Sequence, residues 1–94
     1  MTPIKIFVDS SAPVAPLTLP MLDDTLMSEA QQVIIIDASA NASVNNIVVN
    51  TGGVSDVIKQ IGIAPAALVT LATDSVISVF TASENRAWNT TIFE

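Results

Sequence analysis

The alternation of apolar and polar positions predicts short β-strands along most of the chain. Residues 4–8, IKIFV, place two isoleucines and a valine on one face and Lys5 and Phe7 on the other. This period of two is typical of a strand with one face buried. The segment therefore predicts a half-buried strand near the start of the chain.

A second stretch predicts a strand of another kind. Residues 33–36, VIII, are four consecutive apolar residues inside QVIIID. An unbroken apolar run of this length is typical of a strand that is covered on both faces. We therefore expect some other surface to pack on the outer side of this strand as well as on its inner side.

The connecting segments predict edges and turns. APLTLP at 15–20 is a short extended piece between prolines, which suit an edge strand because each removes a ladder donor. NIVVN at 46–50 predicts another strand that ends at Gly52-Gly53, a pair expected to form a turn with positive φ. Residues 21–32 predict a loop or one short helix, and VSDVIKQI at 54–61 fits a helical face or a short strand, with an extended or single-turn segment favoured.

The last third of the chain predicts a three-stranded antiparallel meander. Residues 68–72 and 76–80 are read as a hairpin joined by the three-residue loop 73–75, and SENR at 83–86 as the next turn. The final strand, 87–93, has Trp88 and Ile92 on one face.

These elements predict an all-β fold, a single small antiparallel β-sandwich or jelly-roll-like barrel of about seven or eight short strands with at most one short helix. The expected division is an N-terminal extended arm, 1–14, and a β-sandwich domain, 15–94.

Charge and composition narrow the classes of function. Nine acidic residues against three basic ones give a formal charge of −6, which disfavours binding to nucleic acid and to anionic lipid. The longest nearly apolar window, 62–72, is shorter than a membrane-spanning helix. Half of the residues are apolar and only 13% are charged, so some apolar surface is expected to be buried between chains.

The residue types offer little catalytic chemistry. Histidine, cysteine and tyrosine are absent, which removes the usual general base, the thiolate nucleophile and the commonest transition-metal ligands. The adjacent pair Asp23-Asp24 is read as a solvated cap or loop. A calcium site from Asp23, Asp24, Asp37 or Asp74 would lack the spaced Asp-x-Asp-x-Asp-Gly loop. We expect no enzyme activity, no cofactor and no metal.

Two side chains stand out as contact candidates. Trp88 is read as a core or interface residue, with a sugar-stacking platform as the less favoured alternative. Arg86 is a candidate for a specific contact, such as a carboxylate across a subunit boundary, or is a solvated turn residue. The residues expected at an interface are Ile4, Ile6, Phe7, Val8, Arg86 and Trp88.

Several motifs in order resemble a small β-module of tailed-bacteriophage virion structural proteins. They are LTLP at 17–20, VIIIDASANASVNNIVVNTGG at 33–53, DVI at 56–58, ALVTLATDSVISVF at 67–80 and NRAWNTTIF at 85–93. The resemblance covers roughly residues 15–94. The chain departs from the pattern in lacking a glycine in the turn before the tryptophan and in carrying the additional segment 1–11.

The resemblance implies a virion structural protein without catalytic residues. The expected role is a capsid decoration or cement protein that binds and stabilises the assembled head, with a small tail fibre, spike or baseplate module as the alternative. The expected partners are the chain itself, as a trimer or dimer, and the major capsid protein or another virion protein. The expected location is the capsid surface, after synthesis in the bacterial host cytoplasm. An inhibitor or adaptor unrelated to virions remains a further alternative.

Overall fold

The computed structural model describes residues 3–22, 31–83 and 86–94, and this part of the chain is all-β. Its nine strands are β1 (Ile4–Val8), β2 (Leu17–Thr18), β3 (Gln32–Asp37), β4 (Ile47–Asn50), β5 (Val57–Gln60), β6 (Ile63–Ala66), β7 (Leu68–Leu71), β8 (Ile77–Ser83) and β9 (Ala87–Phe93). The predicted all-β sandwich is confirmed. None of the described residues forms a helix long and apolar enough to cross a bilayer.

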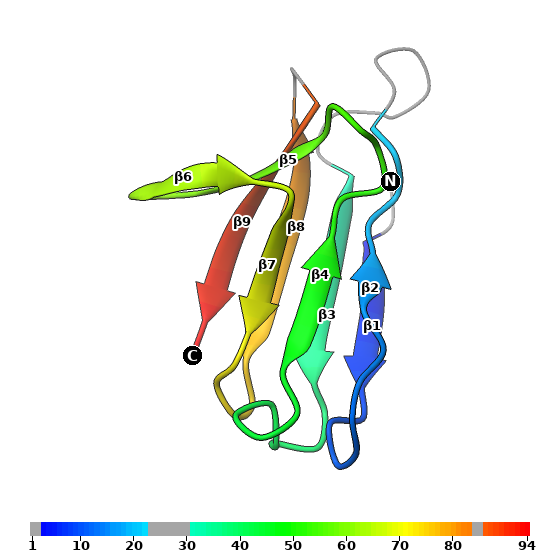
Figure 1. Cartoon of the computed structure of the whole chain (residues 1–94), viewed down its shortest axis with the longest axis vertical. Helices are drawn as coiled ribbons and strands as arrows, with labels where there is room; N and C mark the ends of the chain where they lie inside the picture. The colour runs from blue at the N-terminus through cyan, green and yellow to red at the C-terminus, as the bar shows by residue number, and fades with distance from the viewer. Residues whose placement is uncertain (1–2, 23–30, 84–85) are drawn as a thin grey trace.

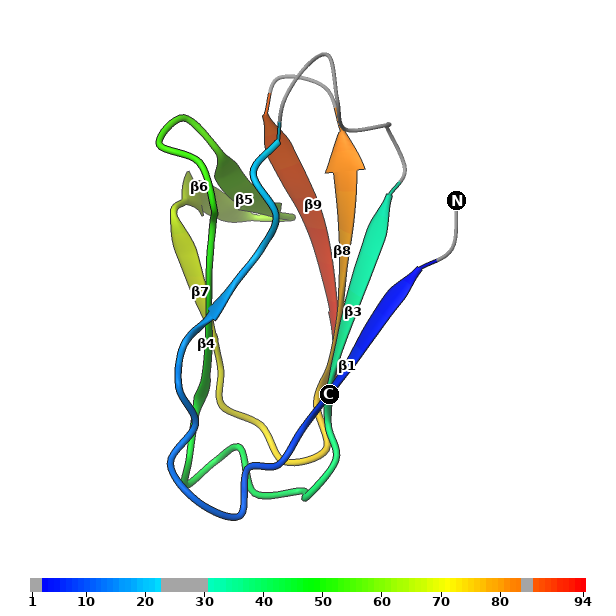
Figure 2. The same ribbon diagram turned by 90° about the vertical axis from the view of Figure 1, so that its right-hand side faces the viewer.

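The strands form two sheets that pack face to face (Figures 1 and 2). The larger sheet has the order β1-β3-β8-β9-β5-β6 and the smaller one the order β2-β4-β7. The pairs β1–β3, β2–β4 and β5–β9 are parallel, and the remaining pairs are antiparallel. The sheets are therefore mixed, whereas the strand pattern alone suggested a purely antiparallel sandwich.

The core lies between the two sheets and is filled by alternate residues of the central strands. Trp88, Phe80, Ile35, Ile47 and Leu71 are the largest fully buried side chains. In β3 burial alternates strictly, so the inward residues are buried and the outward ones only half-buried. The period-two patterns of β1 and β9 point the expected residues inward, although Ile4 at the start of β1 stays largely exposed.

The segments expected to form a hairpin at 68–80 do not pair with each other. β7 pairs with β4 in the smaller sheet, whereas β8 pairs with β3 and β9 in the larger one. The connection between them crosses from one sheet to the other. Ser75 has a positive φ of 63°, and Val76 is buried. The two strands thus face each other across the core, and only β8 and β9 form the predicted antiparallel pair.

The glycine pair after β4 is used for close approach and not for positive φ. A Cβ on Gly52 would lie 2.2 Å from the carbonyl oxygen of Leu19, and one on Gly53 would lie 2.6 Å from the Asp56 carboxylate. Gly62 is the only described glycine with positive φ, and it lies in the turn between β5 and β6. The predicted turn at Gly52-Gly53 is therefore correct in place, but wrong in its physical reason.

This contact gives a testable stability effect. Gly52→Ala is expected to lower the free energy of unfolding by about 1–3 kcal/mol, because the backbone of Leu19 must move to admit the methyl group. Gly62→Ala is a useful comparison, because its Cβ would meet no atom within 4 Å and its cost comes from positive φ alone. Urea unfolding of both variants measures the effect, and an unchanged midpoint for Gly52→Ala would contradict the close approach.

Three other expectations can be compared with the structure. β2 is an edge strand, β4 ends before the glycine pair, and the ambiguous segment 54–61 contains the extended strand β5. The possible helix at 21–32 falls mostly on residues 23–30, and the SENR turn on 84–85, which lie outside the described residues. β6 was not anticipated, because it is short, contains Pro65 and exposes every residue.

The segment expected to act as an arm is, in the single chain, the edge strand of its own sheet. β1 pairs in parallel with β3, from Ile4 opposite Val33 to Val8 opposite Asp37. The other edge of β1 has no strand beside it among the described residues. That this segment reaches a neighbouring molecule as an arm stays a prediction.

Candidate interaction face

At one end of the sandwich, polar side chains form hydrogen bonds that join the loops to one another. We call this the lower end, where the connections 9–16, 38–46 and 72–76 gather (Figure 1). Asp37 closes β3 and is buried. Its carboxylate accepts hydrogen bonds from the Ser10 hydroxyl and from three backbone N–H groups, those of Ser39 at 3.3 Å, Ala42 at 3.0 Å and Ser75 at 3.0 Å.

These bonds set the protonation state of the buried carboxyl. Burial raises the pKa of Asp37, but the hydrogen bonds from Ser10, Ser75, Ala42 and Ser39 outweigh it and hold the pKa below its ordinary value. Asp37 was considered as a calcium ligand from the sequence. In the structure its acceptor positions are used by the chain itself, so we assign it a structural role.

Ser10 and Asp74 extend the same network. The Ser10 carbonyl accepts from Asn45 Nδ2 at 2.9 Å, and the Ser10 hydroxyl accepts from the N–H of Asn41 at 3.0 Å. Asp74 accepts from the N–H of Ser43 at 2.9 Å. Within the described ranges, no group of three or more acidic side chains could hold a metal ion. Asp23 and Asp24 lie outside these ranges.

A second polar cluster joins segments at the opposite end. Asp56 is buried and accepts the N–H of Leu22 at 2.8 Å. Arg86 Nη1 lies 3.7 Å from Asp56 Oδ1 and donates to the Leu22 carbonyl at 2.5 Å. Arg86 is a turn residue with a φ of 56°. The guanidinium singled out from the sequence therefore has a carboxylate partner, and that partner belongs to its own chain.

Trp88 lies in the core of the single chain. It projects inward from β9, is completely buried and has no hydrogen-bond partner for its indole N–H among the described residues. Of the candidates for an interface, Val8 is also buried and Ile6 is half-buried. Ile4 and Phe7 are exposed. The six residues that were expected at an interface are thus distributed between the core and the surface, and Trp88 takes the core position that was one of its two interpretations.

A groove between β9 and the hairpin of β5 and β6 offers no reactive group. It is lined by Gln60, Ile61, Thr90, Thr91 and Ile92. None of these side chains titrates near neutral pH. The groove therefore lacks an acid, a base or an activated nucleophile.

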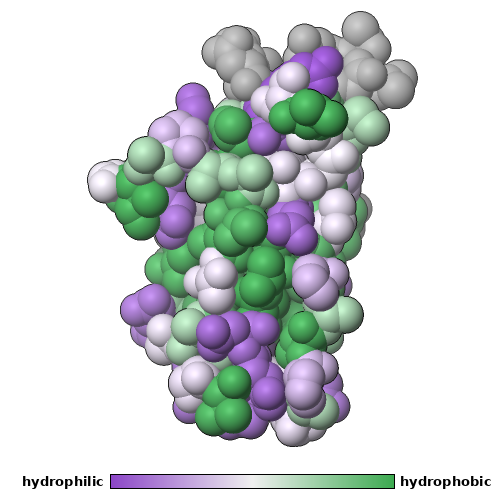
Figure 3. Space-filling model, in the orientation of Figure 1, coloured by the Kyte–Doolittle hydropathy of each residue, from purple (hydrophilic) through white to green (hydrophobic). Residues whose placement is uncertain are grey.

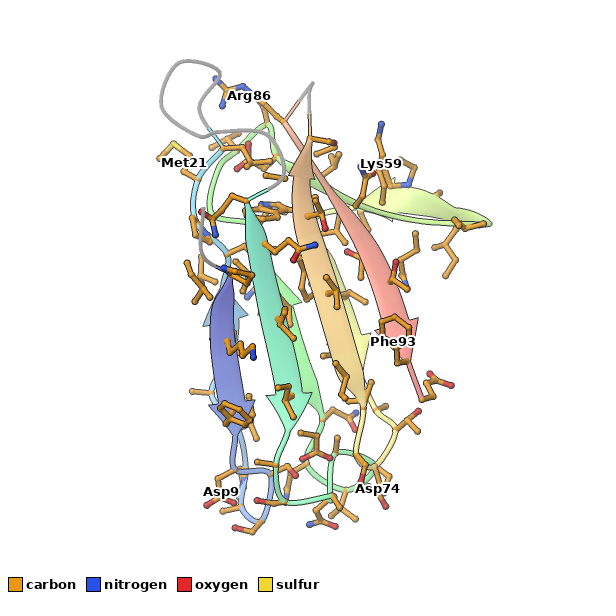
Figure 4. The ribbon with its side chains drawn as sticks, turned by 180° about the vertical axis from the view of Figure 1, so that it is seen from behind. Asp9, Met21, Lys59, Asp74, Arg86 and Phe93 are labelled. Carbon is orange, nitrogen blue, oxygen red and sulfur yellow. The ribbon has the colours of Figure 1, made fainter. Side chains whose placement is uncertain are left out.

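The outward side of the larger sheet, which we call the outer face, carries an apolar row that crosses four strands. The register aligns Phe7 of β1 with Ile36 of β3, Ile36 with Ile77 of β8, and Ile77 with Phe93 of β9. Figure 4 views this face directly and shows Phe93 near the end of β9. We call these four residues the apolar row.

The next row lies farther from the lower end, and its two central residues continue the apolar surface. Lys5, Ile34, Val79 and Thr91 are aligned across the same strands. A third row is polar and consists of Gln32, Thr81, Asn89 and Lys59. The outer face is thus apolar near the lower end and polar at its other end.

The apolar row is open to solvent. Phe7 is 67% exposed, Phe93 is 55% exposed and Ile77 is 38% exposed. Four aligned apolar side chains on one solvent-facing side of a sheet are unusual, because an exposed antiparallel face normally carries polar residues. The VIII run of β3 led us to expect that the outer side of this strand is covered. No described segment of the chain lies over that side (Figure 4).

The smaller sheet has a more mixed outward side. Thr18 and Asn50 are aligned, as are Val48 and Thr70, and Leu68 faces outward beside Asn50. Figure 3 shows apolar atoms over β4 and β7 interspersed with polar ones. No aligned apolar row crosses this sheet in its described strands, so the outer face of the larger sheet is the stronger candidate for an interaction.

A second exposed apolar element is the β5–β6 hairpin, which projects from the body of the sandwich (Figure 1). Ile61 in its turn is fully exposed, and Ile63 is 59% exposed. Pro65 lies on the outer strand and removes a backbone donor from that edge. The hairpin therefore presents apolar side chains and a strand edge that lacks one backbone donor.

Charges are arranged unevenly around the outer face. Both lysines of the chain, Lys5 and Lys59, lie on it, whereas Asp9 and Asp74 lie at the lower end (Figure 4). Hydrogen bonds from the Ser11 hydroxyl, the Ser39 hydroxyl and the Ser11 backbone lower the pKa of Asp9 to about 2. Asp9 is therefore ionised at any pH at which the protein would ordinarily be handled.

Sequence reasoning identified Phe7 as an interface residue but missed Ile36, Ile77 and Phe93. Each of the three could be read as an outward position on its own strand, but their alignment depends on a register that a single sequence does not reveal. Comparison of the chain with models of protein families and with curated proteins finds no match.

Proposed function

We propose that this protein is a non-enzymatic structural protein of a bacteriophage virion, a decoration or cement protein that binds the assembled head. The observation that carries the proposal is the apolar row of the outer face, in which Phe7 and Phe93 remain more than half exposed. A monomer gains nothing from such a row. An assembly in which the row is buried gains the hydrophobic free energy of covering it.

The distribution of polar groups supports a binding role over a catalytic one. The carboxylates of Asp37 and Asp56 are buried and engaged with loop backbones, and Arg86 is engaged with Asp56 and Leu22. These groups hold the scaffold. The side chains that the scaffold exposes on the apolar row and in the turn of the β5–β6 hairpin are apolar.

Two separate apolar surfaces suit a protein that joins more than one partner. The hairpin projects away from the sandwich body, and the apolar row lies on the sheet face (Figures 1 and 4). A cement protein needs such an arrangement, because it must contact neighbouring subunits together. By linkage, a protein that binds only the assembled shell stabilises that shell against dissociation.

The choice of a virion follows from the resemblance of residues 15–94 to β-modules of tailed-phage structural proteins. A structural protein of the head shell is present in many copies per particle. The copy number therefore distinguishes a head protein from a tail protein. A chain of this kind needs no turnover, cofactor or metal to act.

The copy number in particles tests the proposal. Quantitative mass spectrometry of purified particles of the phage that encodes the chain should find hundreds of copies, in a simple ratio to the major capsid protein. A handful of copies would instead assign the chain to the tail as a fibre, spike or baseplate module. Absence from the particles would overturn the virion role.

A further inference from the structure

We propose that the outer face binds a second copy of this chain, with the strands of the two copies antiparallel across a two-fold axis that runs along the apolar row. The inference rests on the proposed function, in which the outer face is an interface, and it names the partner. In this arrangement each residue of the row meets its own counterpart, so Phe7 faces Phe7 and Phe93 faces Phe93 of the second copy.

The order of charges along β1 and in the residue that follows it, Asp9, supports this arrangement. Lys5, Phe7 and Asp9 occupy alternate positions, with the lysine on one side of the apolar row and the carboxylate on the other. At about 3.3 Å per residue, Lys5 and Asp9 lie about 7 Å from Phe7 in opposite directions. Rotation about the row therefore places Lys5 of each copy opposite Asp9 of the other, which creates two equivalent ion pairs.

The separation of packed sheets allows these pairs to form. Sheets that pack face to face lie about 10 Å apart, a gap that a lysine side chain from one sheet can cross. Asp9 has a pKa of about 2, held there mainly by the Ser11 and Ser39 hydroxyl groups, so it retains its charge for the partner lysine.

The alternative two-fold arrangement, with the axis parallel to the strands, is electrostatically poorer. It would place β1 opposite β9 of the second copy. Lys5 would then face Thr91, its counterpart in the second row, so the lysine would have no carboxylate opposite it. One arrangement thus pairs opposite charges, and the other leaves Lys5 and Asp9 without a partner of opposite charge.

The size of the face sets the expected strength. Four strands about 4.8 Å apart, over the distance of about 14 Å between Lys5 and Asp9, give a shared face on the order of 300 Å². Stable interfaces bury about 800 Å² on each partner. The chain also carries a net charge of −6, which opposes self-association at low salt. We therefore expect a dimer that forms reversibly, with a dissociation constant in the micromolar range.

Sedimentation equilibrium of the full chain over a range of concentrations tests the inference. The wild type should sediment as a monomer–dimer equilibrium. Lys5→Glu and Asp9→Lys, each alone, should weaken dimerisation by about tenfold or more, since each places like charges together. An equimolar mixture of the two variants should restore association as a one-to-one heterodimer. Lys59→Glu is the matched control for Lys5→Glu, because it changes the net charge by the same amount but lies in the polar third row. It should leave dimerisation near the wild-type level.

A second route avoids the loop contacts of Asp9. Phe93→Lys keeps the Asp9 network intact and places a charge in the apolar row, so it should abolish dimerisation while its circular dichroism spectrum remains that of the wild type. Circular dichroism of Asp9→Lys verifies that its loss of the Ser11 and Ser39 bonds leaves the fold in place.

Each contrary outcome overturns the inference. A wild type that stays monomeric to about 1 mM, or that forms a trimer, excludes the two-fold dimer. A dimer that is insensitive to both charge variants, or variants that fail to rescue each other while folded, exclude the antiparallel alignment. The proposed function can fail separately. If the chain dimerises but is absent from virions, only the virion role is contradicted. If it is a monomer present in hundreds of copies per virion, only the self-association is contradicted.

Discussion

Asp37→Ala is expected to lower the free energy of unfolding by about 3–5 kcal/mol at pH 7. The variant removes a buried acceptor that serves the Ser10 hydroxyl and three backbone N–H groups. The Ser10 hydroxyl and the N–H of Ala42 would then be buried without this partner. Since the whole stability of a small domain is about 5–15 kcal/mol, the loss would be large. Urea unfolding followed by far-ultraviolet circular dichroism measures it.

The same carboxylate predicts how stability depends on pH. The pKa of Asp37 is lower in the folded chain than its ordinary value of 3.8, so the unfolded state binds the proton more readily. Its contribution is therefore complete above about pH 5 and is lost as the pH falls through the folded-state pKa. The difference in stability between the wild type and Asp37→Asn should shrink as the pH is lowered from 7 to 3.

Asp74→Asn is the matched control. Asp74 lies at the same end of the sandwich but is exposed and accepts only the N–H of Ser43 among the described bonds. Its loss should cost less than about 1 kcal/mol. Equal effects of substitution at the two positions would contradict the central role of Asp37.

Trp88→Ala is expected to cost about 3–5 kcal/mol of stability through the cavity that it leaves. Trp88 is completely buried on the inner face of β9, between the two sheets. Because the variant lacks the only tryptophan of the chain, its unfolding must be followed by circular dichroism rather than by fluorescence.

Trp88→Phe separates packing from polarity. The indole N–H of Trp88 has no hydrogen-bond partner in the described structure, so removal of this group leaves no described acceptor unsatisfied. The phenylalanine variant should therefore recover more than half of the stability lost in Trp88→Ala. An alanine variant with an unchanged unfolding midpoint would show that the side chain is not part of the core.

The strands could be predicted from the sequence because their burial is local. The alternation in IKIFV and AWNTTIF marks the inward residues of β1 and β9, and Pro16 and Pro20 mark an edge at β2. Sheet membership could not be read in this way. β7 and β8 satisfy the length rule for a hairpin, but their inward side chains belong to opposite layers of the core, and only the tertiary structure determines that.

The candidate face was predictable only in part. The VIII run of β3 indicated that the outer side of the larger sheet should be covered, and Phe7 was placed at a contact. The alignment of Phe7 with Ile36, Ile77 and Phe93 joins residues up to 86 positions apart through three separate registers. Asp37 shows the same limit, since its donors come from three connections and its type alone suggested only a possible calcium ligand.

The loop network at the lower end has a consequence for the motions of the sandwich. The three connections gathered there each cross between the sheets, and one buried carboxylate binds all of them. Separation of the two layers at this end therefore requires the hydrogen bonds to all three connections to break together. The buried amide of Ala42 would therefore exchange with solvent only in the rare molecules in which this whole network opens.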